Sequence, residues 1–366
     1  MGRWIIRNGR YWANGRFQKN TEYSLETDTE SDLEVVLNDD DLVVPGLIDF
    51  HLHLWAPGSP MGIASEKLYA DGIVACADAG SFGYRDWLSA NRFWQNSSKV
   101  IVKSWLSVLP NGLIEVPMRI IDPSEISVDL LVAAARKAEH GTLLGFKVPI
   151  GWKDADTDRT MLRITREAAD RTGLPIMTHV SGACIPLSEI ITYLRKGDVI
   201  SHIYSGLHGR EVLNGSAEAR DSFRHAKERG IVMDIAFGVE KHFSWNTFLR
   251  EFGEGLAADT VSTDVVDFTY KCPDYPVSDL YGLLSALYAA GVNRDELYRA
   301  VIDTPAKQMG IDLQSLNNTL VIRPLKEEER SFSKTEGVVT GDTVFSPMLF
   351  VDRGRIITDR LTCRDK

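Results

Sequence analysis

Short apolar runs recur along the middle of the chain, and Gly or Pro residues punctuate many of them. Some of the spacers between the runs, such as residues 127–140 and 158–171, have the apolar periodicity of helices. Strands that alternate with helices predict a parallel sheet, and a set of eight predicts a (β/α)8 TIM barrel, here over residues 47–315. The runs are residues 47–54, 73–79, 100–109, 143–149, 175–180, 199–203, 231–237 and 260–265.

The two flanks of the chain have a different pattern. Residues 1–46 and 316–366 are predicted to form short strands and turns, with Asn8-Gly9 and Asn14-Gly15 as turn signals. We therefore expect a small β-rich domain in addition to the barrel.

Two histidines stand at the end of the first apolar run. Pro45-Gly46 opens this run, which predicts a buried strand. His51 and His53 are two residues apart, so on a strand both imidazoles point to the same side. Such a pair is costly to bury unless something binds it, which favours a metal site. The alternative is a pair of hydrogen-bonded histidines at a strand end.

Four later runs also carry a residue of metal-binding type. Lys147 lies inside an apolar run, whereas His179, His202 and Asp264 each end one. A structural zinc site usually closes with four ligands, often thiolates, so six candidates without a cysteine fit two metal ions with open positions better. Imidazole and carboxylate ligands suit Zn²⁺, but also Mn²⁺, Fe²⁺ or Co²⁺.

In these residues the chain resembles the amidohydrolase superfamily of metal-dependent hydrolases. It looks most like the dihydroorotase-like branch, and in particular like its deacetylases of small acetylated acids. The matching stretches are residues 45–53, 77–81, 145–148 and 304–310 together with His179, His202 and Asp264. The resemblance implies that the two flanks, residues 1–46 and 316–366, pair into one small β-sandwich domain beside the barrel.

The resemblance also implies a role for each candidate ligand. His51, His53 and Asp264 would hold the first metal, His179 and His202 the second, and a carboxylated Lys147 would bridge the two. Water shared by the metals would lose a proton near neutral pH, because the cations lower its pKa from about 16 to roughly 7. The hydroxide would attack a polarised carbonyl, and Asp264 would pass the proton to the leaving nitrogen or oxygen.

Lys147 is the residue that discriminates most between interpretations. A protonated lysine beside two divalent cations would be repelled, and an apolar strand offers it no solvent. Neutral lysine can add carbon dioxide to form a carbamate, whose two oxygens can bridge two metals, as in the enzymes that the chain resembles. The alternative is a lysine that reaches the barrel rim or pairs with a carboxylate.

Loops after the strands are expected to set substrate specificity. A buried substrate carboxylate would need a paired cation or hydrogen-bond donors. Arg210, Lys153 or Lys241 could supply that cation. The candidates for substrate contact are Tyr204, Arg210, Lys153 and His208, and Trp55, Trp152 and Lys241 also lie in loops after strands. Each basic residue can instead be solvated, and His208 and His242 can contact substrate, bond to a ligand or serve their own loops. His140 and His225 lie in helical patterns and are expected at the surface.

Several functions fit this site. The leading hypothesis is hydrolysis of an amide or ester in a small acylated acid, and deacetylation is its first form. The alternative is hydrolysis of a cyclic amide, as in dihydroorotases and hydantoinases. A deaminase fits less well, because Lys147 would then lack a purpose. A scaffold that kept the barrel without catalysis is a different class, which the presence of all six candidate ligands disfavours.

Composition narrows the range of partners. The net charge of −10 at pH 7 argues against nucleic-acid and anionic-membrane partners. No apolar run approaches the roughly 20 residues that span a bilayer, and residues 1–9 lack the apolar core of a signal peptide. We expect a cytoplasmic protein with a small-molecule substrate, and a homo-oligomer is possible. The dispersed cysteines, expected as reduced thiols, are Cys76, Cys184, Cys272 and Cys363.

Overall fold

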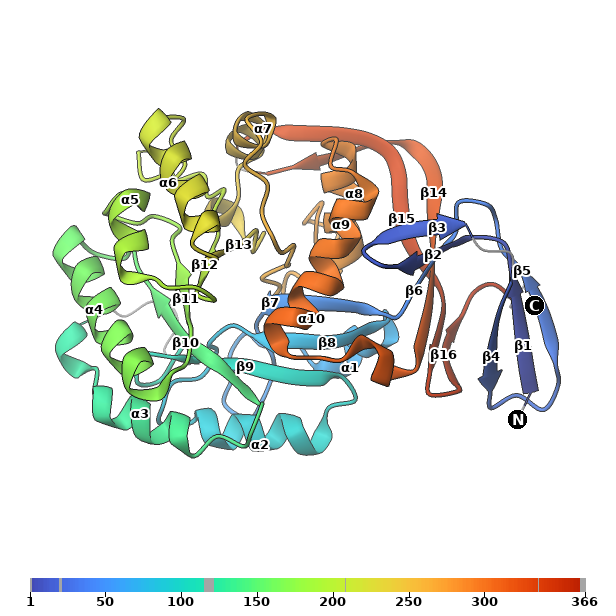
Figure 1. Ribbon diagram of the computed structural model, residues 1–366, viewed down its shortest axis with the longest axis horizontal. Helices are drawn as coiled ribbons and strands as arrows, with labels where there is room; N and C mark the ends of the chain where they lie inside the picture. The colour runs from blue at the N-terminus through green and yellow to red at the C-terminus, as the bar shows by residue number, and fades with distance from the viewer. Residues whose placement is uncertain (1, 20–21, 115–121, 208, 335, 363–366) are drawn as a thin grey trace.

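A parallel sheet of seven strands forms the centre of the molecule (Figure 1). The computed structural model describes residues 2–19, 22–114, 122–207, 209–334 and 336–362. Each strand pairs with the next one along the chain, and nearly every residue in them is buried. The strands are β7 (Leu47–Leu52), β8 (Ile73–Asp78), β9 (Ile101–Ser107), β10 (Leu143–Pro149), β11 (Ile176–His179), β12 (Val199–Ser201) and β13 (Val232–Asp234).

Residues 260–265 close this sheet into a barrel. On one side, the amide of Ile235 donates to the carbonyl of Thr260 at 3.1 Å. On the other side, the amide of Asp264 donates to the carbonyl of His51 at 2.7 Å. The predicted (β/α)8 fold is therefore confirmed. The eighth segment, however, forms an isolated bridge in place of a regular strand, because the backbone of Asp264 is left-handed (φ 51°) and interrupts the ladder.

Helices surround the barrel (Figure 1). Most of them begin at a side-chain cap. Asp154 and Ser244, for example, accept hydrogen bonds from the backbone amides of Thr157 and Thr247. The helices are α1 (Ser65–Ala70), α2 (Trp87–Ser97), α3 (Val128–Arg136), α4 (Ala155–Thr172), α5 (Leu187–Ile190), α6 (Ala217–Glu228), α7 (Trp245–Gly253), α8 (Leu280–Ala289), α9 (Arg294–Val301) and α10 (Asp303–Met309). Short 3-10 turns are η1 (Pro123–Glu125), η2 (Ile191–Tyr193), η3 (Glu240–His242) and η4 (Leu313–Leu316).

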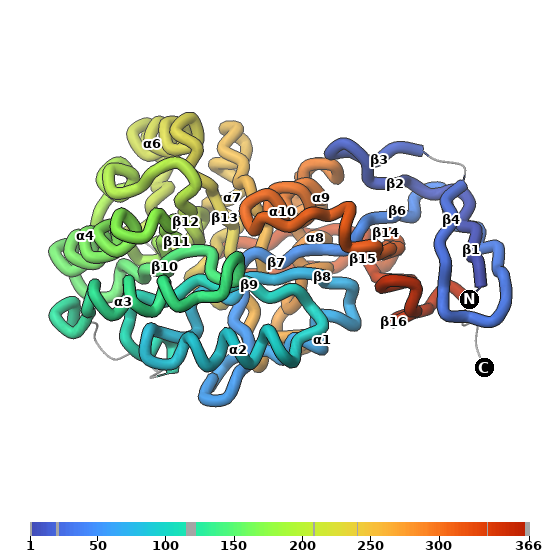
Figure 2. The backbone as a smooth tube through the Cα atoms, turned by 60° about the horizontal axis from the view of Figure 1, so that its bottom comes forward, coloured from blue at the N-terminus to red at the C-terminus, as the bar shows by residue number. Residues whose placement is uncertain are grey.

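Both flanks of the chain contribute to a pair of sheets at one end of the molecule (Figure 2). A three-stranded sheet has the order β4-β1-β5, and a six-stranded sheet has the order β16-β15-β14-β6-β2-β3. A buried apolar cluster that includes Trp4, Val43 and Leu349 joins them. The strands are β1 (Gly2–Arg7), β2 (Arg10–Ala13), β3 (Arg16–Lys19), β4 (Glu22–Thr27), β5 (Leu33–Val36), β6 (Leu42–Val44), β14 (Asn318–Ser333), β15 (Val338–Asp352) and β16 (Arg355–Asp359).

Strands β14 and β15 are much longer than the other strands. Their hairpin connects the six-stranded sheet, called the end sheet below, to the barrel. Its two strands have 16 and 15 residues. At one end Leu320 pairs with Val44 of β6. Along its length β15 packs on α8, where the amide of Phe345 donates to Ser285 Oγ at 3.0 Å, and its tip comes close to α7 (Figure 1). None of the described helices has the length and apolar character that crossing a membrane requires.

Candidate metal centre

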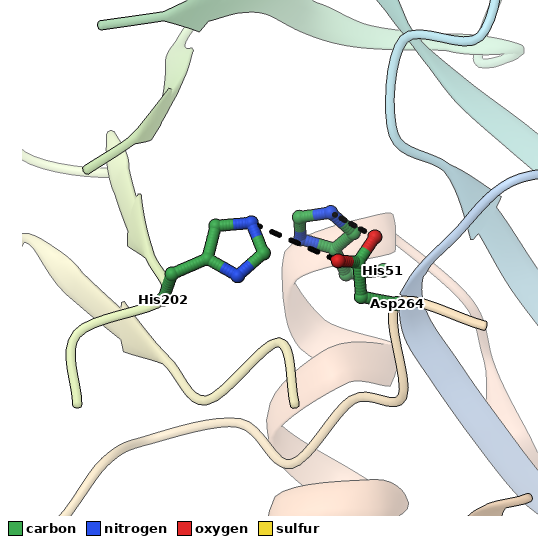
Figure 3. A group of neighbouring side chains, drawn as sticks. All are labelled: His51, His202 and Asp264. Atoms are coloured by element: carbon green, nitrogen blue, oxygen red, sulfur yellow. Dashed lines mark ion pairs between the residues drawn. The ribbon is translucent and has the colours of Figure 1, made fainter. Parts of the chain in front are cut away.

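Three of the six candidate ligands meet at the carboxyl ends of β7 and β12 and of the eighth segment (Figure 3). One side-chain atom each from His51, His202 and Asp264 lies within 4.8 Å of the others. The two carboxylate oxygens of Asp264 face different partners. Oδ1 lies 3.3 Å from Nε2 of His51 and 3.2 Å from Nε2 of His53, whereas Oδ2 lies 4.0 Å from Nε2 of His202.

The other candidate ligands line the same cavity. Nζ of Lys147 lies 3.2 Å from Nε2 of His51, and the lysine is only 6% exposed. The ring centroid of His179 lies 4.2 Å from that of His202. The backbone near Lys147 leaves little room, since a Cβ added to Gly80 would lie 2.8 Å from Lys147 Cβ. The structure thus brings together all six residues that the sequence singled out, and their ligand roles stay predictions.

Hydrogen bonds behind the cavity orient three of the histidines. Nδ1 of His51 lies 3.2 Å from Oδ2 of the buried Asp234. Nδ1 of His53 lies 2.9 Å from Ser81 Oγ, and Nδ1 of His202 lies 2.8 Å from the carbonyl oxygen of Ala236. Partners at Nδ1 fix the ring planes and leave the Nε2 atoms directed at the cavity. This is the usual arrangement around imidazole ligands of a metal.

Electrostatics keep several of these groups in the protonation state that metal binding needs. Burial lowers the pKa of Lys147 to about 8, which favours the neutral amine. Burial, together with the neighbouring histidines, also holds the pKa values of His179 and His202 well below the usual range. Burial opposes ionisation of Asp264, but the histidines around it outweigh burial and hold its pKa well below its usual value.

The donor set fits two divalent cations. Neutral imidazoles and an ionised carboxylate are the forms that bind metal. The low pKa values of His179, His202 and Asp264 favour these forms, whereas Asp264 and Asp234 outweigh burial and raise the pKa of His51. Two of the candidate ligands, His202 (φ 64°) and Asp264 (φ 51°), have left-handed backbones, which are rare outside glycine. Such strain is stored where a side chain must be aimed at one point, which supports a functional role for this edge of the barrel.

Comparisons with known proteins agree with the geometry. No protein-family model matches the sequence. A deacetylase of Agrobacterium fabrum is 26% identical over 282 residues, which cover 75% of this chain and 67% of the relative. A deacetylase of Enterococcus faecalis is 22% identical over 310 residues, which cover 81% of each chain.

Solved structures show the same fold over nearly the whole chain. A dihydroorotase aligns with a TM-score of 0.80 at 19% identity, covering 97% of this chain and 98% of its own. An adenine deaminase aligns with a TM-score of 0.79, also at 19% identity, covering 96% and 98%. These comparisons fit the resemblance to the amidohydrolase superfamily that the sequence shows.

The cavity also contains two loop residues that the sequence left as open candidates. Nδ1 of His242 lies 2.9 Å from Asp264 Oδ2, and the His242 ring packs 4.4 Å from that of His202. Lys241 lines the same cavity. Both follow β13. From the sequence, Lys241 was one of three possible partners of a substrate carboxylate, and His242 could contact substrate, bond to a ligand or serve its own loop. The sequence does not show that Gly238 lies between these two side chains. A Cβ added to Gly238 would lie 2.4 Å from both His242 Nδ1 and Asp264 Oδ2, so glycine at this position lets the two side chains meet.

Several of the predicted substrate contacts are not found in the cavity. Tyr204 was predicted to contact substrate, but it is fully buried against Phe243 and Phe248 and donates its hydroxyl to the carbonyl of Leu256, so it belongs to the core. Arg210 and Lys153 are exposed and lie outside the described lining of the cavity. His208 lies outside the described residues.

Two tryptophans that follow strands lie in different places relative to the cavity. Trp152 lines the cavity, and its ring centroid lies 6.1 Å from that of His179. Trp55 instead packs on Phe93 away from the cavity lining. Cys184 is half-buried and has a free thiol. Its backbone amide donates to Asp158 Oδ2, so the residue serves the loop rather than the metal centre.

Proposed function

We propose that this protein is a metal-dependent amidohydrolase that cleaves the amide or ester bond of a small acylated acid, with deacetylation as the first reaction to test. The observation that carries the proposal is the convergence of the six candidate ligands, with a buried lysine among them, on one cavity. The sequence relatives named deacetylases support the same chemistry.

The candidate ligands divide into two groups. His51, His53 and Asp264 would hold one divalent ion, and His179 and His202 a second, with Lys147 between them as a carboxylated bridge. Zinc is the first ion to test, and manganese, iron and cobalt suit the same donors. When bound, the two ions would supply a nucleophilic hydroxide near neutral pH and polarise the carbonyl of the substrate.

Lys147 has the properties that carboxylation requires. The neutral amine attacks the carbon of CO₂, a nitrogen–carbon bond forms, and one proton leaves to give the carbamate anion. Burial lowers the pKa of Lys147 to about 8, so a useful fraction of the amine is neutral near physiological pH. The cavity beside it leaves the side chain accessible to a molecule as small as CO₂.

Asp264 would move the proton during hydrolysis. Its carboxylate is ionised, because its pKa is held well below the usual value, and it faces the cavity. It can therefore accept the proton of the attacking water and deliver it to the leaving nitrogen or oxygen. His242, at 2.9 Å from Oδ2, holds the carboxylate in one orientation while it does so.

The cavity itself favours an acid with an apolar body. Its volume is about 360 Å³, and much of its wall is apolar. The described lining includes two lysines, Lys147 and Lys241. With Lys147 carboxylated, Lys241 would bind the substrate carboxylate at the rim. The apolar side chains in the wall include Met61, Leu109, Leu113, Trp152, Val239 and Phe268.

A substrate panel tests the proposal and separates it from hydrolysis of cyclic amides. Metal-supplemented protein is assayed with N-acetyl amino acids, O-acetyl hydroxy acids, hydantoins and dihydroorotate. We expect turnover of acetylated acids, and we expect the Lys241→Ala variant to raise their KM about tenfold. The exposed Lys153→Ala variant should leave KM unchanged. Turnover of the cyclic substrates alone would reject the deacetylase proposal.

A further inference from the structure

The tip of the β14–β15 hairpin ends against the loop that follows β13. At about 3.3 Å per residue the hairpin is roughly 50 Å long, which lets one end pair with β6 while the other reaches the barrel. Among the described residues of the tip, Lys334, Glu336 and Gly337 lie next to the loop 238–244 and the start of α7. The hairpin thus joins the end sheet to the rim of the metal centre.

Lys334 holds the beginning of this loop. Its Nζ donates a hydrogen bond to the carbonyl oxygen of Gly238. The same Nζ lies 4.1 Å from the ring centroid of Phe237, a cation–π contact. Gly238 is the residue on which the contact between His242 and Asp264 depends for space, so Lys334 acts directly on a sterically critical position.

Glu336 holds the end of the loop. Its backbone carbonyl accepts a hydrogen bond of 2.9 Å from the amide of Trp245, and its Oε2 accepts one of 3.0 Å from Ser244 Oγ. Ser244 is also the N-cap of α7 and is fully buried. Gly337 packs just as closely, because an added Cβ would lie 2.7 Å from Asn246 Oδ1.

Polar contacts also attach the loop to the barrel. The amide of Gly238 donates to the carbonyl of Thr263 and the amide of Ser244 to the carbonyl of Tyr204, each at 2.9 Å. The carbonyl oxygen of Lys241 accepts hydrogen bonds of 3.1 Å from the amide of Gly206 and from Ser181 Oγ. His242 contacts Asp264 as described above. The loop that contributes Lys241 and His242 to the cavity is therefore fixed on one side by the barrel rim and on the other by the hairpin tip.

We propose that Lys334 and Glu336 are positioning residues, which hold the loop 238–244 so that Lys241 and His242 face the metal centre. Neither residue lines the described cavity, so both act through the loop. The end sheet would thereby take part in catalysis at a distance. The effect on turnover rests on the proposed function, whereas the effect on the loop does not.

Backbone hydrogen exchange of residues 237–246 tests the proposal without any substrate. We compare the wild-type protein with the Lys334→Ala and Glu336→Ala variants. We expect exchange in this segment to quicken about tenfold in both, while α4 exchanges at the wild-type rate. Glu336→Ala removes the acceptor of the Ser244 hydroxyl and keeps the backbone carbonyl, so it serves as the test even where Lys334→Ala does not fold. Lys334→Arg, which keeps a cation and donors, should restore most of the protection.

The matched control is Lys326→Ala in the same hairpin. Lys326 pairs with Asp342 at 2.6 Å between exposed side chains, away from the loop. We expect this variant to exchange like wild type at 237–246. Unchanged exchange in both tip variants, or an equal increase in Lys326→Ala, would overturn the proposal.

Kinetics provide the second readout. With an acetylated acid that the wild type hydrolyses, the tip variants should lose about tenfold in kcat/KM at unchanged metal content. Wild-type kcat/KM in variants whose loop exchanges faster would contradict the positioning role. Should the wild type hydrolyse no acylated acid, the proposed function fails, and the exchange experiment still decides the role of the tip.

Discussion

Nδ1 of His242 and Oδ2 of Asp264 lie 2.9 Å apart, which ties a loop residue to the aspartate at the end of the eighth barrel segment. The other oxygen of Asp264 faces His51 and His53. The carboxylate is thus held from two sides, by two barrel-strand histidines and by the loop after β13. Its orientation depends on both.

The contact between His242 and Asp264 can be broken by a single methyl group. A Cβ at residue 238 would lie 2.4 Å from both side chains, so Gly238→Ala should push them apart and lower kcat/KM by about 100-fold. Gly173→Ala is the control, because Gly173 has a similar backbone (φ 73°) and open space around it. Both variants should lose stability from the strained φ, and only Gly238→Ala should lose activity. Equal activities would contradict the account.

Asp264 is expected to be essential for turnover and less so for metal binding. In Asp264→Asn the amide can still occupy the site but cannot accept a proton, so turnover should fall by about 100- to 10,000-fold while much of the metal stays bound. Asp267→Asn, at an exposed carboxylate paired with Lys67, is the control and should be normal. Rates and metal content are measured on the same samples. Near-normal turnover in Asp264→Asn would remove this residue from the mechanism.

Lys147 is expected to be required for the metals themselves. Lys147→Ala should lose bound metal and activity together, and a short carboxylic acid that mimics the carbamate should restore part of both. The exposed Lys153→Ala variant should retain its metal. Wild-type metal content in Lys147→Ala, measured by elemental analysis, would refute the bridging role.

The sequence predicted those features that depend on local periodicity. The strand period of two placed His51 and His53 on one side. The polar ends of later runs singled out His179 and His202, because carboxyl ends of parallel strands meet at one rim, and Lys147 stood out as a lysine inside an apolar run. Tyr204 failed as a prediction because position after a strand does not tell whether a side chain turns to the cavity or to the barrel wall.

Other features depend on contacts between distant segments and were out of reach of the sequence. His242 meets Asp264 only because Gly238 leaves space between them, and no periodic pattern encodes that. The eighth segment was placed correctly, yet its irregular pairing follows from the left-handed Asp264. The contacts of Lys334 with Phe237 and Gly238 require the full length of the hairpin. The pattern of apolar residues predicts strands there but does not predict how far the hairpin extends.

Asp49 gives the fold a predictable dependence on pH. It is 1% exposed and accepts hydrogen bonds from the amide (3.1 Å) and the hydroxyl (2.6 Å) of Thr263, which tie β7 to the eighth segment. Burial raises the pKa of Asp49 to about 7, although the bonds from Thr263 oppose this. The folded protein therefore keeps a proton that the unfolded chain releases near its ordinary value of 3.8. The contribution of Asp49 to stability is complete below that value and is lost as the pH rises to about 7.

Asp49→Asn should remove this dependence, since the amide stays neutral and can donate to the Thr263 hydroxyl. Between pH 5 and 7, the free energy of unfolding of the metal-free wild type should fall relative to the variant by up to about 1.4 kcal/mol per pH unit. Urea unfolding at several pH values measures the difference, in which titration of other groups cancels. Parallel stability curves for the two proteins would contradict the raised pKa.

The most direct test of the metal centre is an anomalous diffraction measurement on crystals grown with divalent metal and bicarbonate. We expect two anomalous peaks, one beside His51, His53 and Asp264 and one beside His179 and His202. Density for a carboxylate on the Lys147 side chain should lie between them. An unmodified Lys147 with no anomalous peak among these residues would contradict the account.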